Sequence, residues 1–225
     1  MIRRDFPDAA GCAQALAEAL ARAVSGKLQT QPRATLALSG GRSPEAVLPV
    51  LAAKPLDWAR VDVTLVDDRR VPEADSASNA GLVRRLFLDA GAGAAAFHPL
   101  WTEGTDMADV LADTDSRLAP LWPADVGYLG MGPDGHVASL FSADDAAAFE
   151  NGDFGVMYSE APSAPHGRIG LTMIKLLQIE KLFLHVTGTA KIRVLEDAVN
   201  GGPTPDLPIS LLLHDRADVE AFVCE

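Results

Sequence analysis

The sequence predicts an α/β fold: a doubly wound, mostly parallel sheet with helices on both faces, formed by a single domain over residues 1–225. Short apolar runs of strand length alternate along the chain with longer runs of helical periodicity, and no internal repeat interrupts them. Hydrophobic residues make up 48% of the chain, which is enough for a substantial core. Such alternation favours parallel strands joined by right-handed crossovers.

Apolar periodicity places the elements of the first half of the chain. Asp8 is suited to cap a helix in which Leu16, Leu20 and Val24 recur at helical spacing, and Gly26 is suited to end it. The elements expected next are a strand over 34–38, a helix that Ser43 caps and Pro44 opens, a strand over 61–66 and a helix over 79–89.

The second half continues the alternation. The elements expected are a helix over 106–118, strands over 125–129, 155–159, 181–187 and 218–223, and a helix over 190–199. Ligands of open α/β sheets bind beyond the carboxyl ends of the strands. The loops that follow strands are therefore the candidates for chemistry.

The segment 129–141, LGMGPDGHVASLF, breaks from an apolar strand into a glycine-rich loop. Its glycines permit positive φ and a close approach of the backbone to a ligand. His136 lies in this loop, and histidine has the side-chain pKa nearest neutral, so His136 is suited to act as a general base. The alternative is an ordinary turn with a solvated histidine, but Asp134 and His136 flank a glycine where a turn requires neither.

An earlier loop, Ser39-Gly40-Gly41-Arg42, lies between a predicted strand and a predicted helix. Adjacent glycines let successive N–H groups point inward, and a helix start favours an anion by about 0.3–1 kcal/mol. Arg42 adds a full positive charge. The loop therefore resembles a phosphate cradle, although a glycine pair also serves as an ordinary strand-to-helix turn and the spacing matches no standard nucleotide-binding motif.

A charged run, Asp67-Asp68-Arg69-Arg70, begins where another buried strand is predicted to end, and Asn79 follows shortly after it. An acidic pair can hold a guanidinium in a fixed pose, and a fixed guanidinium can bind phosphate or stabilise an oxyanion. The alternative is a solvated loop whose charges pair with one another.

Two further cations, Arg168 and Lys191, lie in the last third of the chain. Lys191 falls at the start of a predicted helix, where it can meet a phosphoryl group as a mobile point charge; a solvent-exposed helix lysine is the alternative. The remaining histidines lack the spacing of metal sites and are predicted to be structural or surface residues: His98, His166, His185 and His214.

The composition of the chain limits the classes of binding partner and the cellular location that we expect. A net charge of −12 opposes nucleic-acid binding, whereas an anionic small molecule requires only a few converging cations and amides. No stretch approaches the roughly 18 apolar residues of a membrane span, and the N-terminal segment lacks the apolar core of a secretory signal, so we expect a soluble, cytoplasmic protein. Cys12 and Cys224 are too few for a disulfide framework and too isolated for metal-type spacing, and Cys12 is predicted to pack within a helix.

These residues give the chain a resemblance to the 6-phosphogluconolactonases, within the wider sugar-phosphate isomerase and deaminase group. The motifs fall in the family's order and extend over most of the chain: Ser39-Gly40-Gly41, the run at 67–69 with Val71-Pro72 and Ser78-Asn79, Leu129 to Phe141, Arg168-Ile169 with Leu171-Thr172, and Gly188 with Lys191. The glycine-histidine segment is the most specific of them.

The resemblance implies a sugar-phosphate isomerase/deaminase-like fold, no metal or organic cofactor, and hydrolysis of the δ-lactone of 6-phosphogluconate in the oxidative pentose phosphate pathway. His136 would activate the attacking water, Asp134 would orient its imidazole, and Arg69 would face the developing oxyanion. Binding of the substrate and its phosphate falls to the remaining motif residues, namely Ser39, Gly40, Gly41, Arg42, Asp67, Asn79, Gly132, Arg168 and Lys191.

The chain departs from the family pattern at five positions. Arg42 replaces a small polar residue, Asp68 is shorter than the usual Glu, and Arg70 stands where an apolar or aromatic residue is common. Val137 replaces a frequent Thr, and Gly170 interrupts the usual Arg-Ile-Thr stretch, so hydroxyl contacts expected at these two positions are lost.

Two other functions compete with lactone hydrolysis. An aminosugar-phosphate deaminase or isomerase is expected to continue with Asn-Glu-Pro after its phenylalanine, whereas here Phe141 is followed by Ser-Ala-Asp, and Arg69 stands where that family favours Tyr. A noncatalytic sugar-phosphate sensor is expected to lack the histidine or to carry a DNA-binding domain, and neither feature is visible. Nothing in the sequence specifies an oligomeric state.

Overall fold

The structure is a computed structural model, and it describes residues 1–102, 106–142, 144–145, 155–162 and 166–225. Seven strands form its main sheet: β1 (Ile2–Phe6), β2 (Ala34–Leu38), β3 (Val61–Leu65), β5 (Ala96–His98), β6 (Val126–Gly130), β9 (Lys181–Thr187) and β10 (Glu220–Cys224). Their order is β1-β10-β9-β6-β2-β3-β5, and every neighbouring pair is parallel. The predicted α/β fold with a parallel sheet is confirmed.

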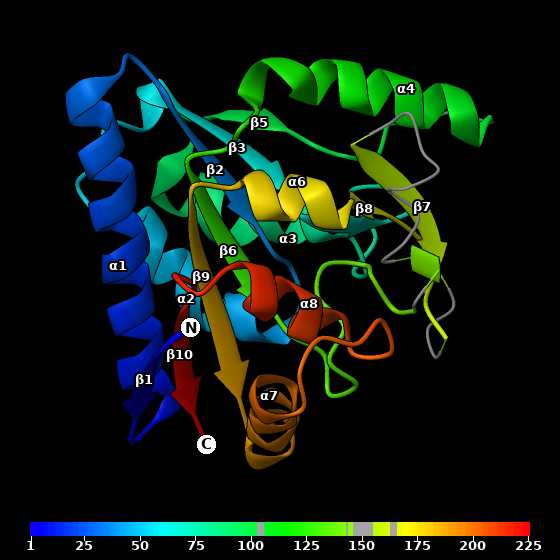
Figure 1. Cartoon of the computed structure of the whole chain (residues 1–225). Coiled ribbons are helices and arrows are strands. Elements are labelled where there is room, and N and C mark those ends of the chain that lie inside the picture. The colour runs from blue at the N-terminus through cyan, green and yellow to red at the C-terminus, as the bar shows by residue number, and fades with distance from the viewer. Residues whose placement is uncertain (103–105, 143, 146–154, 163–165) are drawn as a thin grey trace.

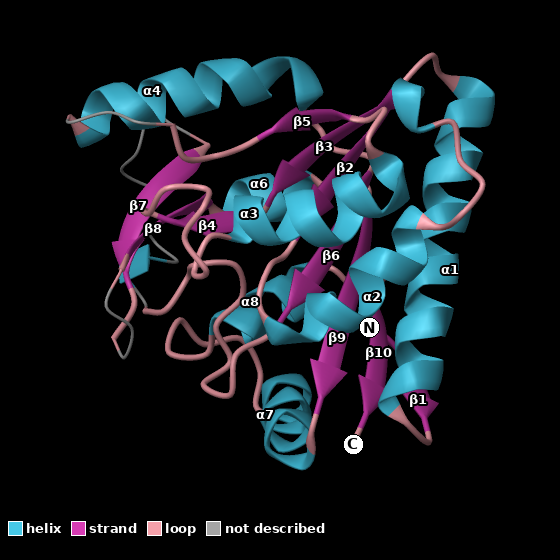
Figure 2. Cartoon of the chain, turned by 180° about the vertical axis from the view of Figure 1, so that it is seen from behind, coloured by secondary structure: helices cyan, strands magenta, loops and turns pink. Residues whose placement is uncertain are grey.

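Helices cover both faces of this sheet. One face carries α1 (Ala9–Thr30), α2 (Arg42–Ala52) and α3 (Asn79–Val83), which continues as the π-helical segment η2 (Arg84–Ala92). The other carries α6 (Met173–Gln178), α7 (Thr189–Asn200) and α8 (Pro208–Asp215). Figure 1 shows α6 and α8 in front of the sheet, and the opposite view in Figure 2 brings α2 and α3 forward. The remaining helical segments are η1 (Trp58–Arg60), α4 (Met107–Leu118) and η3 (Ala119–Leu121).

A second, three-stranded sheet lies beside the first and was not predicted. It consists of β4 (Asp67–Arg69), β7 (Val156–Glu160) and β8 (Gly167–Leu171), in the antiparallel order β4-β8-β7. The sequence predicts a loop at 67–70 because its four charged residues show no apolar alternation. Pairing with β8 makes this segment a strand, since backbone hydrogen bonds do not depend on side-chain type.

The core explains why most strands were predictable. Every residue of β2 and of β3 is buried, so neither strand has a solvent-facing side, and apolar residues predominate in both. In α1, Leu16, Leu20 and Val24 are all 0% exposed, as their helical spacing predicts. Cys12 is likewise buried in α1, which confirms its predicted packing within a helix.

Two predicted helix boundaries are wrong. Gly26 does not end α1, which continues to Thr30, because Gly26 keeps helical backbone geometry instead of a positive φ. Helix α2 begins at Arg42 with Gly41 at its cap position, and the Ser43 hydroxyl lies 3.1 Å from the Thr187 hydroxyl instead of capping the helix. No helix within the described ranges is long and apolar enough to cross a membrane.

Candidate active site

The candidate site lies where the strand order changes direction. The strands β9, β6, β2 and β3 are consecutive neighbours in the sheet. From β2 the chain proceeds to β3 on one side, whereas β6 and later strands extend the sheet on the other side, so β2 and β6 flank a topological switch point. Ligands of open α/β sheets bind in the crevice outside such a point. The loops after these four strands contain the predicted motifs.

A cavity of about 250 Å³ opens at this edge of the sheet. Its lining includes most of the predicted site residues: Ser39, Gly40, Gly41, Arg42, Asp67, Arg69, Asn79, Gly132, His136 and Lys191. Asp134 and Arg168 instead line an adjoining cavity of about 150 Å³, which shares Asp67, Arg69 and His136 with the first. The predicted residues therefore surround two connected chambers with His136 at their junction.

The loop after β6 aims the His136 side chain. Gly135 has a φ of +80°, and its N–H donates to the Gly132 carbonyl at 3.1 Å, which closes a tight turn. The Gly132 N–H in turn donates to the His136 carbonyl at 2.9 Å. A Cβ at Gly132 would lie only 2.2 Å from the imidazole and 2.5 Å from a carboxylate oxygen of Asp134. Glycine is therefore required at 132 so that the histidine ring can lie over the backbone.

Asp134 holds the imidazole of His136. Its Oδ1 lies 2.5 Å from Nδ1, and this hydrogen bond lowers the pKa of Asp134, so the carboxylate is charged at neutral pH. The ring also packs against Phe141 with centroids 4.7 Å apart. With Nδ1–H donating to the carboxylate, Nε2 retains a lone pair for a proton, and 29% exposure of the side chain leaves it accessible.

The glycine loop after β2 forms the floor of the main cavity. The Ser39 hydroxyl accepts a hydrogen bond from the Gly130 N–H at 3.0 Å, which ties this loop to the end of β6. A Cβ at Gly40 would lie 2.0 Å from Oδ1 of Asn79, so only glycine fits there. Gly41 has a φ of +94° and precedes α2, whose N-terminus receives no capping hydrogen bond from any described side chain. Its free N–H groups suit an anion.

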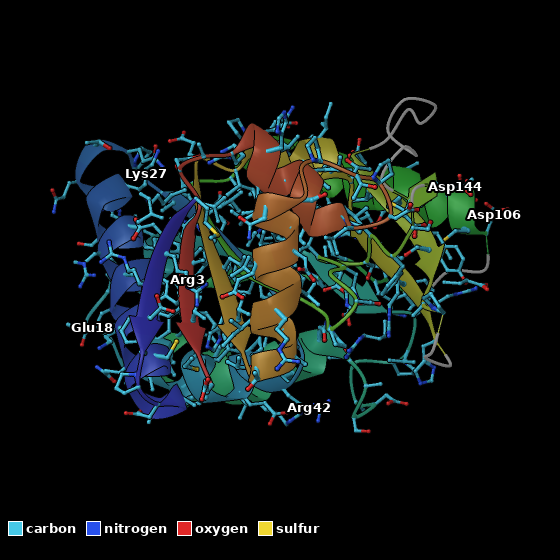
Figure 3. The ribbon with its side chains drawn as sticks, turned by 60° about the horizontal axis from the view of Figure 1, so that its bottom comes forward. Arg3, Glu18, Lys27, Arg42, Asp106 and Asp144 are labelled. Carbon is cyan, nitrogen blue, oxygen red and sulfur yellow. The ribbon has the colours of Figure 1, made fainter. Side chains whose placement is uncertain are left out.

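Lys191 and Arg42 bring two positive charges to the same end of the cavity. Gly188, with a φ of +92°, starts α7, and its N–H donates to the Cys224 carbonyl at 2.9 Å, which fixes the turn against β10. Burial and the nearby Arg42 guanidinium lower the pKa of Lys191. Figure 3 labels Arg42 close to the start of α7. An additional anion at this end would offset the repulsion between the two cations.

Asp68 organises the connection from β4 to α3. Its side chain is buried and accepts the backbone N–H groups of Arg69 and Asn79 at 2.7 Å each and that of Ala80 at 3.1 Å. Burial raises the pKa of Asp68 to about 6, although these donors act in the opposite direction. Sequence reasoning treated this residue as part of an acidic pair that could hold a guanidinium and as a departure from the family pattern, whereas it binds backbone N–H groups. Its position after a buried strand was the available signal.

The small sheet places two arginines side by side. Arg69 on β4 pairs with Arg168 on β8 in the antiparallel register. The Arg69 Nη1 donates to the Ala77 carbonyl at 2.6 Å, which fixes that guanidinium. Its Nε and the Nη1 of Arg168 are buried, and neither has a hydrogen-bond partner among the residues that the structure describes. Both guanidinium groups therefore carry unused N–H groups that are suited to an anionic oxygen, and that of Arg69 is already fixed.

Ser139 is a contact that sequence reasoning missed. Its buried hydroxyl donates to Oδ2 of Asp67 at 2.6 Å, and the Asn79 side chain donates to the Asp67 carbonyl at 2.8 Å. Asp67 is thereby fixed between the end of β3 and the histidine loop. Its neighbour Ala138 adopts a φ of +49°, which is uncommon for a residue with a side chain. Both residues lie within the 129–141 segment that the sequence singles out.

Comparisons with known proteins give the family. The family model described as glucosamine-6-phosphate isomerases/6-phosphogluconolactonase matches residues 7–221. The chain belongs to this family. A 6-phosphogluconolactonase of Pseudomonas putida is 36% identical, covering 96% of this chain and 90% of that protein, and one of Mesorhizobium japonicum is 40% identical, covering 88% and 85%. The crystal structure of a 6-phosphogluconolactonase from Shewanella baltica superposes with a TM-score of 0.93 at 30% identity, covering 100% of this chain and 98% of that one.

Membership of the glucosamine-6-phosphate isomerase/6-phosphogluconolactonase family agrees with the resemblance inferred from the motifs. The match extends from the first helix to the last strand, so it includes every loop that surrounds the two chambers. The fold that the resemblance implied is likewise confirmed.

Proposed function

We propose that the chain hydrolyses 6-phospho-D-glucono-1,5-lactone to 6-phosphogluconate, as a step of the oxidative pentose phosphate pathway. The observation that carries this proposal is His136, held by Asp134 at 2.5 Å, at the junction of two chambers whose walls carry four cationic side chains. Opening a phosphorylated lactone requires an activated water, a stabiliser for the oxyanion and an anchor for the phosphate.

In this mechanism Nε2 of His136 takes a proton from water as the water attacks C1. Asp134 keeps the opposite nitrogen protonated and stabilises the imidazolium that forms, because its carboxylate is ionised at neutral pH. General-base catalysis of this kind typically contributes about 10²–10⁴-fold. Proton return from the imidazolium to the ring oxygen then releases the sugar acid and regenerates the neutral base.

The tetrahedral intermediate is stabilised by Arg69. Its guanidinium is fixed through the Ala77 carbonyl, and its Nε–H remains unpaired within the described structure, so this donor needs no reorganisation to meet a developing negative charge. Asp67, Asn79 and Gly132 line the same chamber and contact the hydroxyl groups of the sugar acid.

The phosphate binds at the opposite end, where Ser39, Gly40 and Gly41 present backbone to the cavity and Arg42 and Lys191 supply charge. The start of α2 supports the same anion through its free N–H groups. Arg168 lies beside Arg69 and lines the adjoining chamber, so we assign its guanidinium to the oxygens of the sugar acid there instead of the phosphate. This mechanism uses no metal and no organic cofactor. The cytoplasmic location of the protein stays a prediction from the sequence.

An activity measurement tests the proposed reaction. Purified protein is mixed with freshly prepared 6-phosphogluconolactone, and acid release is recorded against spontaneous ring opening. We expect rapid hydrolysis, and poor turnover of gluconolactone without the phosphate, because remote binding energy orients the ester. Ammonia release from glucosamine 6-phosphate is the parallel assay. Deamination without lactone hydrolysis would instead assign the aminosugar function.

The His136→Ala variant tests the proposed base. We expect kcat to fall by about 10²–10⁴-fold with little change in the circular dichroism spectrum, because the ring is partly exposed and takes no part in the core. The matched control is His214→Ala, which changes an exposed histidine on α8 outside both chambers. Wild-type turnover in the His136 variant would exclude this residue from the mechanism.

A further inference from the structure

Three buried side chains outside the candidate active site meet between α1 and the main sheet. Cys12 lies near the start of α1, His185 in β9 and Cys224 at the end of β10, and they are 0%, 2% and 2% exposed. One potential ligand atom from each, two sulfurs and an imidazole nitrogen, all lie within 4.8 Å of one another. Both cysteines are free thiols.

The sheet register explains how residues so distant in sequence come together. In the parallel pair of β9 and β10, His185 is opposite Phe222, so Cys224 lies two residues further along on the same face. Helix α1 packs on these strands and brings Cys12 to the same place. Figure 1 shows α1 alongside β10. Sequence spacing gave no metal signal because each side chain comes from a different element.

The hydrogen bonds of His185 point to a missing partner. Its Nδ1 lies 3.0 Å from the Tyr128 hydroxyl, whereas the buried Nε2 has no hydrogen-bond partner in the described ranges of the chain. Leaving such an atom unsatisfied in the core is unfavourable. Metal-binding histidines usually donate their other ring N–H to a polar group, and the Tyr128 hydroxyl is placed to accept it.

We propose that Cys12, His185 and Cys224 bind one zinc ion through two thiolates and Nε2 of the imidazole. As the two metal–sulfur bonds form, two S–H protons leave to solvent, and no electron is transferred. The two negative thiolates balance the two positive charges of a divalent cation, and the imidazole is neutral. The occupied site therefore adds no net charge to the core. A monovalent soft cation on the same ligands would leave one negative charge buried.

The dimensions suit such an ion. Zn–S bonds of about 2.3 Å and Zn–N bonds of about 2.0 Å place the ligand atoms of a tetrahedral site roughly 3.5–3.8 Å apart. The three ligand atoms lie within 4.8 Å of one another, so small side-chain rotations bring them to these distances. Sites with three protein ligands complete their coordination with water. Glu225, the residue next to Cys224, is exposed, so the end of β10 lies close to solvent.

Cobalt(II), which replaces zinc and absorbs light, tests the proposal. The full-length protein is reduced, freed of metal with a chelator and titrated anaerobically with Co²⁺. We expect thiolate-to-cobalt charge-transfer absorption that saturates at one ion per chain and disappears when Zn²⁺ displaces it. In weakly buffered solution a dye should report two protons released per ion. Proton release is measured on the wild-type protein, so it tests the proposal even if the ligand variants fail to fold.

Variants assign the ligands. Cys12→Ser and Cys224→Ser should each abolish the charge-transfer saturation at one ion, and Tyr128→Phe should weaken the affinity about 10–100-fold without changing the stoichiometry. His136→Ala is the control that removes the candidate active-site imidazole, and it should leave the cobalt spectrum unchanged. Circular dichroism checks that each variant is folded.

Several results would overturn the proposal. These are a titration without saturable thiolate absorption, fewer than two protons released per ion, or a spectrum that persists in folded Cys12→Ser and Cys224→Ser proteins. A reduced wild-type protein that takes up no metal but forms a Cys12–Cys224 disulfide under mild oxidation would identify the cluster as a redox pair instead.

Discussion

Single residues in the candidate site are positioned mainly by backbone groups. Asp68 gathers three backbone N–H donors, and Gly132 provides the space over which the His136 ring lies. The sequence identified the residue types with chemistry, because His136 and Arg69 lie in loops that follow predicted strands. It also identified Asp134, which holds His136, but it did not predict the contacts of Asp68 with backbone N–H groups or of Ser139 with Asp67.

Lys191→Ala should raise KM about 10-fold or more while kcat changes little. A charged hydrogen bond to the phosphate contributes about 1.5–3 kcal/mol, and uniform anchoring acts equally on ground and transition states. Steady-state kinetics on the phosphorylated lactone measures both constants. Arg193→Ala, which removes an exposed cation from the same helix, is the control. A fall in kcat at constant KM would place Lys191 in the chemical step.

Asp68 should make the protein less stable as the pH rises. Its folded-state pKa of about 6 lies above the ordinary 3.8, so the folded protein keeps a proton that the unfolded chain releases. Its stabilising contribution is complete below about pH 4 and is lost as the pH rises through about 6, a change of about 3 kcal/mol.

The Asp68→Asn variant isolates this contribution. Urea unfolding between pH 4 and 7 gives the free energy of unfolding of the wild type and of the variant. As the pH rises, the wild type should lose stability relative to the variant, because only the wild type has the Asp68 carboxyl group. Asp57→Asn, at an exposed carboxylate, controls for general charge effects. Parallel curves would show that the three backbone donors keep Asp68 ionised throughout.

At the scale of elements, the reliability of prediction followed burial. The strands at 34–38 and 181–187 were predicted with the observed bounds because their largely apolar segments are buried in a parallel sheet. The strand predicted at 155–159 occurs as β7 at Val156–Glu160, but it belongs to the antiparallel sheet. Three-residue strands such as β4 and β5 were missed, because so short a segment shows no periodicity.

Gly26→Ala should stabilise the protein by roughly 0.5–1 kcal/mol. Gly26 lies inside α1, its backbone is helical, and a Cβ there meets no atom within 4 Å. Thermal unfolding measures the effect. The matched contrast is Gly91→Ala, where a φ of +151° and a contact of 2.8 Å with the Ala52 carbonyl predict a loss of stability. If Gly26→Ala instead destabilised the protein, the prediction that Gly26 ends the helix would be supported.

At the scale of the whole molecule, strand order concentrates the candidate site at the centre of the sheet. The loops come from β9, β6, β2 and β3, while β1 and β5 form the edges. The chain carries a net charge of −12, yet four cations line the two chambers. A local cluster of positive charge can therefore attract an anion against the field of the whole protein. The single-domain organisation stays a prediction.

Deleting residues 2–5 should separate stability from activity. This segment forms most of edge strand β1, whose first four residues are exposed, and within the described part of the chain its strand partner is β10. Loss of its ladder should cost roughly 1–3 kcal/mol, which lowers Tm by several degrees. The value of kcat/KM should stay close to wild type, because β1 forms an edge of the sheet, away from the strands whose loops surround the chambers. A folded deletion variant without activity would contradict this topology argument.

The sequence by itself determined the α/β class, the central strands and the residue types that are suited to general-base chemistry and to anion binding. Each of these follows from local information: apolar periodicity, glycine spacing and the chemistry of individual side chains. Only the tertiary structure decided which side chains meet. The pairing of Arg69 with Arg168 and the meeting of Cys12, His185 and Cys224 depend on strand register between segments far apart in the chain, which no local pattern encodes.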